Sequence, residues 1–401
     1  MRIDIIDNHL AKLDLDLRKS HNGRFMDQKL THDNLSFICD CILNLVNGDY
    51  SRSFTTRDLW DLEYFCKQVI FVYNKPDPKT QAENEYDKFI NQPLRLLVYA
   101  GVLNDRKVGV SYVYTINNCD LLEYIALNHV NAFNFLVKYL TKVLVDSGEI
   151  HYFDNYEQHF KDGDIDNDDL AGLRSHYADF IRSNTPINGD FEPNRIFNKI
   201  LNILAIYRRM PGTQRGRITD YPMALNDLVY NAINWRDLDK RKDITREEAA
   251  KLGEINEHLN RVTDYEMAKA KAAIRRRHNN VSELNDELAI GEATQAHHIF
   301  SDSRNPEYRA FTENLILLTP SQHNTKAHPG NNTQLLGKDY QKECLLAKLN
   351  SIEESEFNCD GFYSLPKFVG MINKVMFGLN IPDDSTIDDV RQVLNSYTRV
   401  E

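Results

Sequence analysis

Residues 294–333 read TQAHHIFSDSRNPEYRAFTENLILLTPSQHNTKAHPGNNT, and this stretch decides both the local fold and the chemistry that we expect. Two short apolar runs, 296–300 and 315–318, have the length and composition of β-strands and can pair as a small antiparallel ribbon. Thr319 can cap a helix, and Pro320 can occupy its first position, where the missing N–H costs nothing. The stretch therefore predicts a ribbon followed by a helix.

Three histidines lie on these predicted elements. His297 and His298 belong to the first strand, and His323 lies in the first turn of the helix, which should end at Pro329 and Gly330. A ribbon followed by a helix can bring the three rings together although they are far apart in sequence. Two imidazoles can hold a divalent ion and a third can take a proton near pH 7, so the set suits metal-assisted hydrolysis. Spacing alone does not say which histidine does which job.

These residues resemble the HNH, or ββα-metal, nuclease family. The pair His297 and His298 matches the opening pair of the family, and Asn314 matches its middle asparagine. His323 matches the helix ligand, nine residues after the asparagine in the phrase ENLILLTPSQH. The resemblance implies that His298 is the general base and that His297 and His323 hold one metal ion. It implies that Asn314 holds the loop between the strands as part of the catalytic centre.

The resemblance also implies a cofactor of one divalent metal ion per chain, with Mg²⁺ or Mn²⁺ expected first and Zn²⁺ or Ni²⁺ as alternatives. Some family members have a further histidine four residues after the helix ligand, where this chain has Ala327. His328 is one residue too late for the same helical face. We therefore expect water or a phosphate oxygen, in place of a third protein ligand, to coordinate the metal ion. For any one histidine an ordinary structural role is the commoner explanation, but the joint order, gaps and caps favour the nuclease.

Composition sets limits on the class of protein. A chain of 401 residues is long enough for two or three domains, and 42% hydrophobic with 27% charged residues is ordinary for a globular protein. No apolar run could span a bilayer, and the N-terminus carries charges where a signal peptide needs an apolar core. We therefore expect a cytoplasmic protein with no membrane partner, and six cysteines without metal-ligand spacing agree with a reducing compartment.

The net charge of −11 argues against indiscriminate coating of nucleic acid, although local basic clusters exist. Residues 207–217 (YRRMPGTQRGR) and 269–280 (KAKAAIRRRHNN) contain no acid and can neutralise phosphates. The second cluster precedes the histidine pair, where it either delivers a DNA backbone to the metal or forms a solvated helix face. The residues expected at DNA phosphates near the motif are Arg275, Arg276, Arg277, Arg304 and Lys326.

Residues 1–120 show the element order of a winged helix, three helices followed by a β-ribbon. The expected elements are helices at 33–46, from 55 or 56 onward, and at 82–100 with an interruption near Pro93. A turn at 104–107 and an alternating strand at 108–116 should follow. In a DNA-binding winged helix the third helix enters a groove, so Lys88, Asn91 and Arg95 would face bases or phosphates. The same order also occurs in protein-contact modules and in plain scaffolds, so both interpretations stay open.

The expected fold class is mainly α with small β elements (α+β). It comprises a winged-helix-like DNA-binding domain at 1–120, a helical middle at 121–244, and a ββα-metal nuclease domain with flanking helices at 245–401. The sequence alone suggests no chemical role for residues 23–30, GRFMDQKL.

The sequence is most consistent with a metal-dependent HNH endonuclease, a sequence-specific enzyme of the restriction type in bacterial defence. Its partner would be double-stranded DNA, and one active centre per chain favours a homodimer that cuts both strands. Two alternatives stay open. One is a defence or toxin nuclease that acts on RNA or unspecifically on DNA, and the other is a winged-helix regulator with an inactive nuclease remnant. The intact histidine pair argues against the second.

Overall fold

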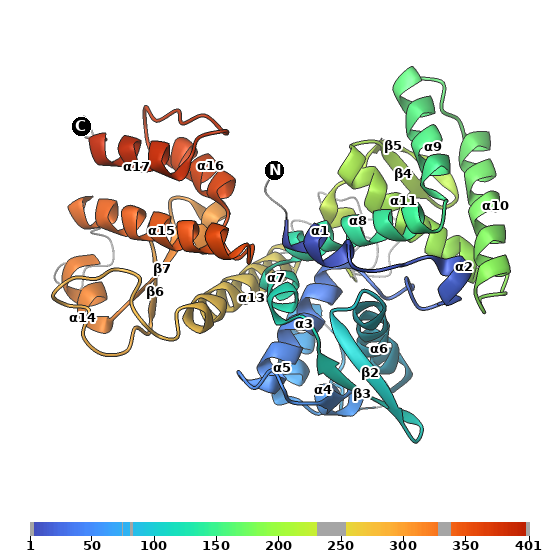
Figure 1. Cartoon of the computed structure of the whole chain (residues 1–401), viewed down its shortest axis with the longest axis horizontal. Helices are drawn as coiled ribbons and strands as arrows, with labels where there is room; N and C mark the ends of the chain where they lie inside the picture. Colours follow the sequence, from blue (N-terminus) through green and yellow to red (C-terminus); the bar gives the residue numbers. More distant parts are fainter. Residues whose placement is uncertain (1–3, 74, 81–82, 231–253, 328–337, 398–401) are drawn as a thin grey trace. The chain divides into compact units, whose positions relative to one another are not determined.

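The computed structural model describes residues 4–73, 75–80, 83–230, 254–327 and 338–397 (Figure 1). Within them the fold is mainly helical with three small antiparallel sheets, which confirms the mainly α class with small β elements. The chain divides into two compact units, Met1–His258 and Leu259–Glu401. The first unit contains both of the ranges 1–120 and 121–244. The expected boundary at 244/245 lies outside the described residues.

A buried helix explains why the first unit has one core. Helix α3 (His32–Val46) packs against α7 (Cys119–Leu127) and α8 (His129–Asp146), and most of its side chains are buried because it is apolar on nearly every side. The hydroxyl of Ser36 donates to the carbonyl of Ala126 at 3.1 Å. Residues before and after position 120 therefore share one hydrophobic interior.

The helices that follow differ in detail from the sequence prediction. The single helix expected from residue 55 onward is two helices, α4 (Thr56–Trp60) and α5 (Glu63–Tyr73). Helix α6 (Glu83–Tyr99) continues through Pro93, where an interruption was predicted. A proline leaves the carbonyl four residues earlier without its helical partner. The side-chain amide of Asn34 donates to that carbonyl, on Phe89, at 3.3 Å, so the helix is not broken.

A three-stranded sheet follows α6. Strands β2 (Leu103–Val108) and β3 (Ser111–Ile116) form a hairpin, and β1 (Phe54–Thr55) pairs with the other edge of β3, giving the order β1-β3-β2. The hairpin turns at Gly109, whose φ is +62°. The sequence predicted a turn at 104–107, and this was wrong because β2 is a largely exposed edge strand that needs few apolar residues.

The other described elements of the first unit are α1 (Ile5–Leu10), α2 (Leu17–Ser20), α9 (Ile150–Asp162), α10 (Asn167–Asn184), α11 (Glu192–Arg208), β4 (Pro211–Gln214), β5 (Arg217–Pro222) and η1 (Leu225–Leu228). The hairpin β4–β5 packs against α11. At the C-terminal end of α11, Arg208 forms ion pairs with Asp154 at 2.9 Å and Glu157 at 2.8 Å. This arginine of the first basic cluster thus has a structural role.

The second unit contains the paired strands β6 (Gln295–His298) and β7 (Leu315–Leu318). Its other described elements are α13 (Glu254–Arg277), η2 (Pro306–Tyr308), η3 (Thr312–Asn314), α14 (Pro320–Gln322), the π-helical turn η4 (His323–Ala327), α15 (Lys338–Asn358), α16 (Leu365–Val375) and α17 (Ile387–Ser396). Strand β7 is fully buried, and α15 and α16 supply apolar side chains to the same unit. The predicted ribbon is therefore present in the core of this unit.

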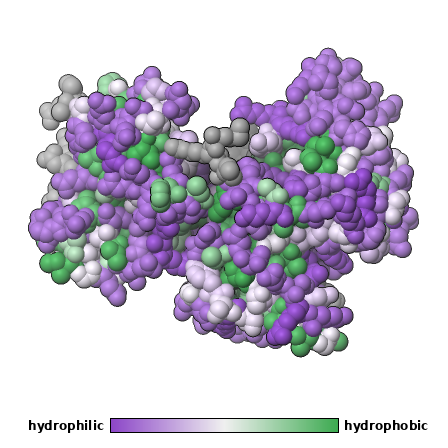
Figure 2. Space-filling view, viewed as in Figure 1, coloured by the Kyte–Doolittle hydropathy of each residue, from purple (hydrophilic) through white to green (hydrophobic). Residues whose placement is uncertain are grey.

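The face of the molecule drawn in Figure 2 is mainly polar. Hydrophilic residues cover most of this face, and hydrophobic residues form small separate patches. No helix in the described ranges combines the length and the apolar character that crossing a bilayer requires. The six cysteines all lie within the described ranges, and no disulfide joins them.

Candidate functional site

The helix after β7 has Thr319 as its N-cap and Pro320 as its first residue, as the sequence predicted, and a capping box with Gln322 fixes this start. The Thr319 hydroxyl accepts from the N–H of Gln322 at 3.2 Å, and the Gln322 side chain accepts from the N–H of Thr319 at 2.9 Å. Gln322 is fully buried, and its amide also donates to the carbonyl of Leu284 at 2.8 Å. After this α-helical start the chain widens into the π turn at His323. The expected end at Pro329 lies outside the described residues.

This geometry brings His297 and His323 together. In the antiparallel ribbon His297 lies opposite Ile316, three residues before the capped helix start. The two ring centroids are 5.4 Å apart and the rings are inclined at 78°. His297 is 6% exposed and His323 is half-buried, so two imidazoles meet at a site that is partly shielded from water.

His298 belongs to a different environment from its neighbour. Successive side chains of a strand point to opposite faces, and the Nε2 atom of His298 lies 2.9 Å from the carbonyl oxygen of Arg309. A carbonyl oxygen only accepts, so in neutral His298 the proton is on Nε2 and the lone pair is on Nδ1. Burial lowers the pKa of His298, and the positive charge of Lys271 lowers it further. His298 is thus held as a neutral base near pH 7.

Of the three imidazoles that the sequence expects to meet, His297 and His323 lie in ring contact, whereas His298 is held at the Arg309 carbonyl on the other face of the strand. Within the ranges that the structure describes, no group of three or more His, Cys, Asp or Glu side chains is placed to hold a metal ion. Two imidazole nitrogens fit a divalent ion that accepts nitrogen and completes its shell with water or phosphate oxygen. This donor chemistry suits Zn²⁺ or Ni²⁺ better than Mg²⁺, which prefers oxygen ligands.

Asn314 closes the loop between β6 and β7. Its side chain is fully buried and accepts from the N–H of Phe300 at 2.8 Å. The same amide donates to the carbonyls of Phe300 at 3.0 Å and Tyr308 at 3.1 Å. All three bonds join the Asn314 amide to backbone atoms of the loop. Asn314 is therefore a positioning residue that fixes the loop between the strands.

One face of α13 runs along the same loop. Asp264, Met267 and Lys271 share this face at helical spacing. The Arg309 guanidinium lies 3.1 Å from the carboxylate of Asp264 and also contacts the sulfur of Met267. The residue whose carbonyl orients His298 is therefore anchored to α13, and Lys271 from that helix acts electrostatically on the His298 ring.

The sequence did not identify Asp264, Lys271 or Arg309 as site residues. Lys271 lies inside the second basic cluster, but only the three arginines that follow it were predicted to contact DNA phosphates. The role of Arg309 depends on its carbonyl oxygen, which no side-chain pattern reveals. The helical period that joins Asp264 to Lys271 could have indicated a common face, although not what that face contacts.

Two of the three arginines in the second basic cluster make contacts within the protein. Arg275 donates to the carbonyl of Thr294 at 3.0 Å and remains exposed. Arg277 forms an ion pair with Asp360 at 2.8 Å and is 22% exposed. Arg276 is half-buried. Arg275 and Arg276 are the better candidates for contact with a ligand, because the charge of Arg277 is already balanced.

The other two cations expected at DNA phosphates, Lys326 and Arg304, differ in how far their charge is already paired within the protein. Lys326 forms ion pairs with Asp286 at 3.3 Å and Glu287 at 2.8 Å. Arg304 is exposed on the loop that follows β6. Arg304 is therefore accessible to a phosphate, whereas Lys326 could contact one only by breaking its ion pairs with Asp286 and Glu287.

The residues expected to read DNA from α6 lie near acids. Lys88 is exposed. Asn91 accepts from the Thr56 hydroxyl at 2.7 Å and donates to Asp87 at 2.6 Å. These bonds hold Asn91 within the protein, and the carboxylate of Asp87 reduces the local positive potential.

Arg95 is held between α6 and the hairpin. It forms an ion pair with Asp105, and its guanidinium lies over the ring of Tyr112 at 4.4 Å from the centroid. Its side chain is 27% exposed. Arg95 therefore braces the hairpin against α6 in this structure, and it does not present an unbalanced charge to a duplex.

A buried ion pair supports the ribbon from behind. Glu283 and Lys348 have fully buried side chains and are in contact, and Glu283 also accepts from the N–H of Leu317 in β7 at 2.8 Å. Lys348 donates to the Tyr363 hydroxyl at 2.8 Å, and the Ser351 hydroxyl donates to Glu283 at 2.7 Å. Burial alone would raise the pKa of Glu283, but the neighbouring Lys348 holds it below its ordinary value. This network ties β7 to α15.

Comparison of the chain with protein-family models, with curated proteins and with solved structures gave no match.

Proposed function

We propose that the chain is a metal-dependent endonuclease that hydrolyses phosphodiester bonds at the site formed by β6, β7 and the helix after them. One observation carries the proposal: His298 is held by the Arg309 carbonyl in the tautomer that keeps Nδ1 basic, and its chain neighbour His297 meets His323 on the other face. A general base at His298 and a two-nitrogen donor pair that includes its neighbour His297 are the minimum set of groups for this reaction.

In the proposed reaction the Nδ1 atom of His298 takes a proton from water as the water oxygen attacks phosphorus. The bond between phosphorus and the 3′ oxygen breaks, and the departing oxygen takes a proton from solvent, so the products carry a 5′ phosphate and a 3′ hydroxyl. The hydrogen bond to Arg309 stabilises the imidazolium that forms, because its carbonyl faces the ring N–H. A divalent ion held by His297 and His323 would supply charge stabilisation at the phosphoryl and leaving oxygens.

Lys271, Arg275 and Arg304 are the cations that we assign to the substrate backbone. Burial lowers the pKa of Lys271, which a phosphate nearby would reverse. Arg275 and Arg304 are exposed on either side of the β6 segment in the sequence. Such contacts position a nucleic acid without reading its sequence.

We further propose that the N-terminal unit binds the target as a winged helix. The order β1-β3-β2 and the position of α6 before the hairpin support this topology. Lys88 is the exposed member of the three residues expected on α6, and Asp87 and Asp105 beside the other two weaken the case for groove reading. A restriction-type role on double-stranded DNA, with two copies cutting two strands, is the specific form of this proposal.

Digestion tests the proposal and its alternatives. The full chain would be incubated with plasmid DNA and with structured RNA in the presence of Mg²⁺, Mn²⁺, Zn²⁺ or Ni²⁺. Discrete DNA fragments support sequence-specific cleavage, and a smear or RNA cleavage supports an unspecific or RNA-directed nuclease. DNA binding without cleavage under any metal would point to a regulator and would reject the enzymatic proposal.

A further inference from the structure

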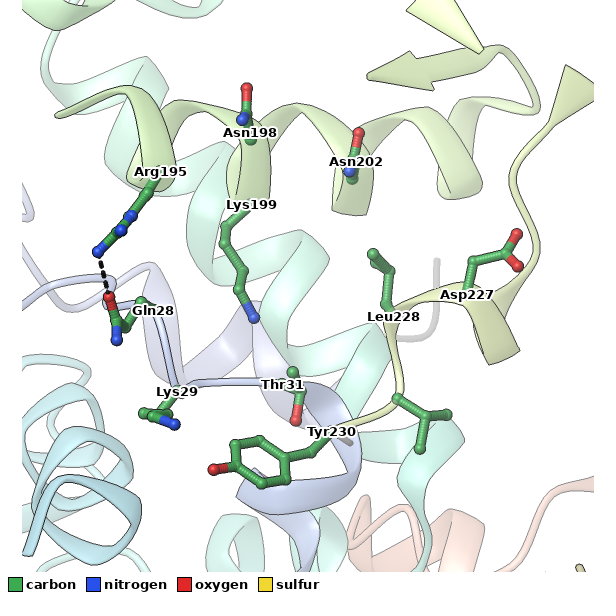
Figure 3. Close-up of a pocket in the computed structure, with 11 residues that line it drawn as sticks. Gln28, Lys29, Thr31, Arg195, Asn198, Lys199, Asn202, Asp227, Leu228 and Tyr230 are labelled. Atoms are coloured by element: carbon green, nitrogen blue, oxygen red, sulfur yellow. Dashed lines mark hydrogen bonds between the residues drawn. The ribbon is translucent and has the colours of Figure 1, made fainter. Parts of the chain in front are cut away.

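A cavity of about 480 Å³ lies in the first unit, within residues that the nuclease proposal does not use. Its walls come from the segment after residue 27, from α11, and from η1 with the two residues that follow it, and they are drawn in Figure 3. Thr31 and Tyr230 are buried and form its floor, while Gln28 and Arg195 are exposed at its rim. The volume lies within the range of small-molecule sites.

The cavity is cationic in an acidic protein. Lys29, Arg195 and Lys199 line it, and Asp227 is the one acid among its lining residues. In Figure 3 Lys199 extends from α11 toward Thr31, and Arg195 reaches Gln28, with which it forms a hydrogen bond of 2.9 Å. The carboxylate of Asp227 already accepts the N–H of Ala224 at 2.8 Å and lies on the exposed rim.

The two cations on α11 lack an opposite charge at close range. Lys199 donates to the carbonyl of Leu30 at 3.0 Å, and Arg195 bonds to the neutral amide of Gln28. Among the described residues, no carboxylate lies within ion-pair distance of either side chain. Lys199 is half-buried, and an ammonium partly removed from water with a neutral partner is stabilised when an anion joins it.

We propose that this cavity binds a small phosphorylated molecule of about mononucleotide size, with Lys199 and Arg195 on the phosphate. The Thr31 hydroxyl and the Gln28 amide, which also line the cavity, offer hydrogen bonds to the rest of the ligand. The phrase GRFMDQKL, which has no account from the sequence, thereby places Gln28 and Lys29 in a wall of the site. The proposal is independent of the histidine site, since none of these residues belongs to it.

The protonation of Lys199 supports this assignment. Burial lowers the pKa of Lys199 to about 8; the carboxylates of Asp33 and Asp27 oppose this shift, and the charge of Lys29 adds to it. A bound phosphate would raise this pKa again, so at pH 8 binding should take up roughly half a proton per site. A cavity that binds an uncharged molecule would not take up this proton.

Calorimetric titration of the full chain with inorganic phosphate, AMP, ATP and adenosine tests the proposal. We expect saturable binding of AMP or ATP, weak binding of phosphate, and none of adenosine. At pH 8 the heat should depend on the ionisation enthalpy of the buffer, which reports the proton uptake. Lys199→Met should weaken nucleotide affinity at least tenfold and abolish the buffer dependence.

Arg195→Gln is the second variant, because Arg195 is exposed and its replacement leaves the interior intact. It should also weaken binding at least tenfold, whereas Arg182→Gln, on the exposed surface pair with Asp179, should change nothing. Circular dichroism would verify that each variant is folded. Absence of saturation by every phosphate compound, equal affinity in Arg195→Gln, or binding of a DNA duplex in place of mononucleotides would overturn the proposal.

Discussion

The buried pair Glu283 and Lys348 gives the sharpest stability prediction. Glu283→Gln keeps an oxygen for the N–H of Leu317 but removes the negative charge that balances Lys348. Both side chains are 0% exposed, so the ammonium would be left in the interior without compensation. Breaking a buried pair from one side costs about 3–5 kcal/mol. We expect the free energy of unfolding of the second unit to fall by that amount.

Urea titration followed by far-ultraviolet circular dichroism would measure this loss. Tryptophan fluorescence is an internal reference, because Trp60 is buried in the first unit and the sequence from residue 259 onward contains no tryptophan. The matched control is Glu287→Gln. Glu287 is exposed and forms a surface ion pair with Lys326, so its replacement should leave the free energy of unfolding nearly unchanged.

A double-mutant cycle separates the charge pair from general damage. The variant with both Glu283→Gln and Lys348→Met leaves no isolated charge, so it should be more stable than the sum of the single losses predicts, by about 2–3 kcal/mol. A Glu283→Gln protein within about 1 kcal/mol of the parent, or strictly additive losses, would refute the reasoning that this pair is a coupled buried unit.

Three further predictions concern the histidine site. Because burial and Lys271 lower the pKa of His298, the cleavage rate should rise with pH and reach its plateau below about pH 6.5. Lys271→Met should move this rise to higher pH. Lys374→Met, a change at an exposed lysine, should leave it in place, and pH-rate profiles of the variants would record both. Asn314→Ala should lower the free energy of unfolding by about 3 kcal/mol in urea titration, since it leaves loop backbone groups unpaired, and a loss under about 1 kcal/mol would contradict its assigned role. His323→Ala should weaken Zn²⁺ or Ni²⁺ binding by more than about tenfold in calorimetry, given that even outer-shell changes cost that much, and unchanged affinity would reject the ligand assignment.

The local geometry of the site could be predicted from the sequence where short-range rules decide it. Thr319 and Gln322 form the capping box within four residues of chain, and the apolar run 315–318 is long enough for one buried strand. The pairing of this strand with the histidine run follows from proximity in sequence. These features need no information from distant parts of the chain.

The arrangement of the three histidines could be predicted only in part. The spacing placed His297 near His323, but strand alternation directs His298 to the opposite face, where the Arg309 carbonyl holds it. The carbonyl and the partner of Arg309, Asp264, lie 11 and 34 residues from His298 in sequence, and only the tertiary fold brings them together.

Long-range contacts account for the other differences. The amide of Asn34 lets α6 pass through Pro93, and nothing near the proline indicates that partner. The cationic cavity combines three segments centred near residues 29, 199 and 229, each unremarkable by itself. The polar residues 104–107 were read as a turn because an exposed edge strand lacks the apolar alternation on which strand prediction depends.

The most direct test of the central claim is cleavage of supercoiled plasmid by His298→Ala, with His151→Ala, a change at an exposed histidine of the first unit, as control. With Mn²⁺, Zn²⁺ and Ni²⁺ each supplied, we predict that the control cuts like the parent and that His298→Ala binds DNA but converts none of it to open or linear form. Cleavage by His298→Ala at the parental rate would contradict the assignment of this histidine as the base and with it the proposed mechanism.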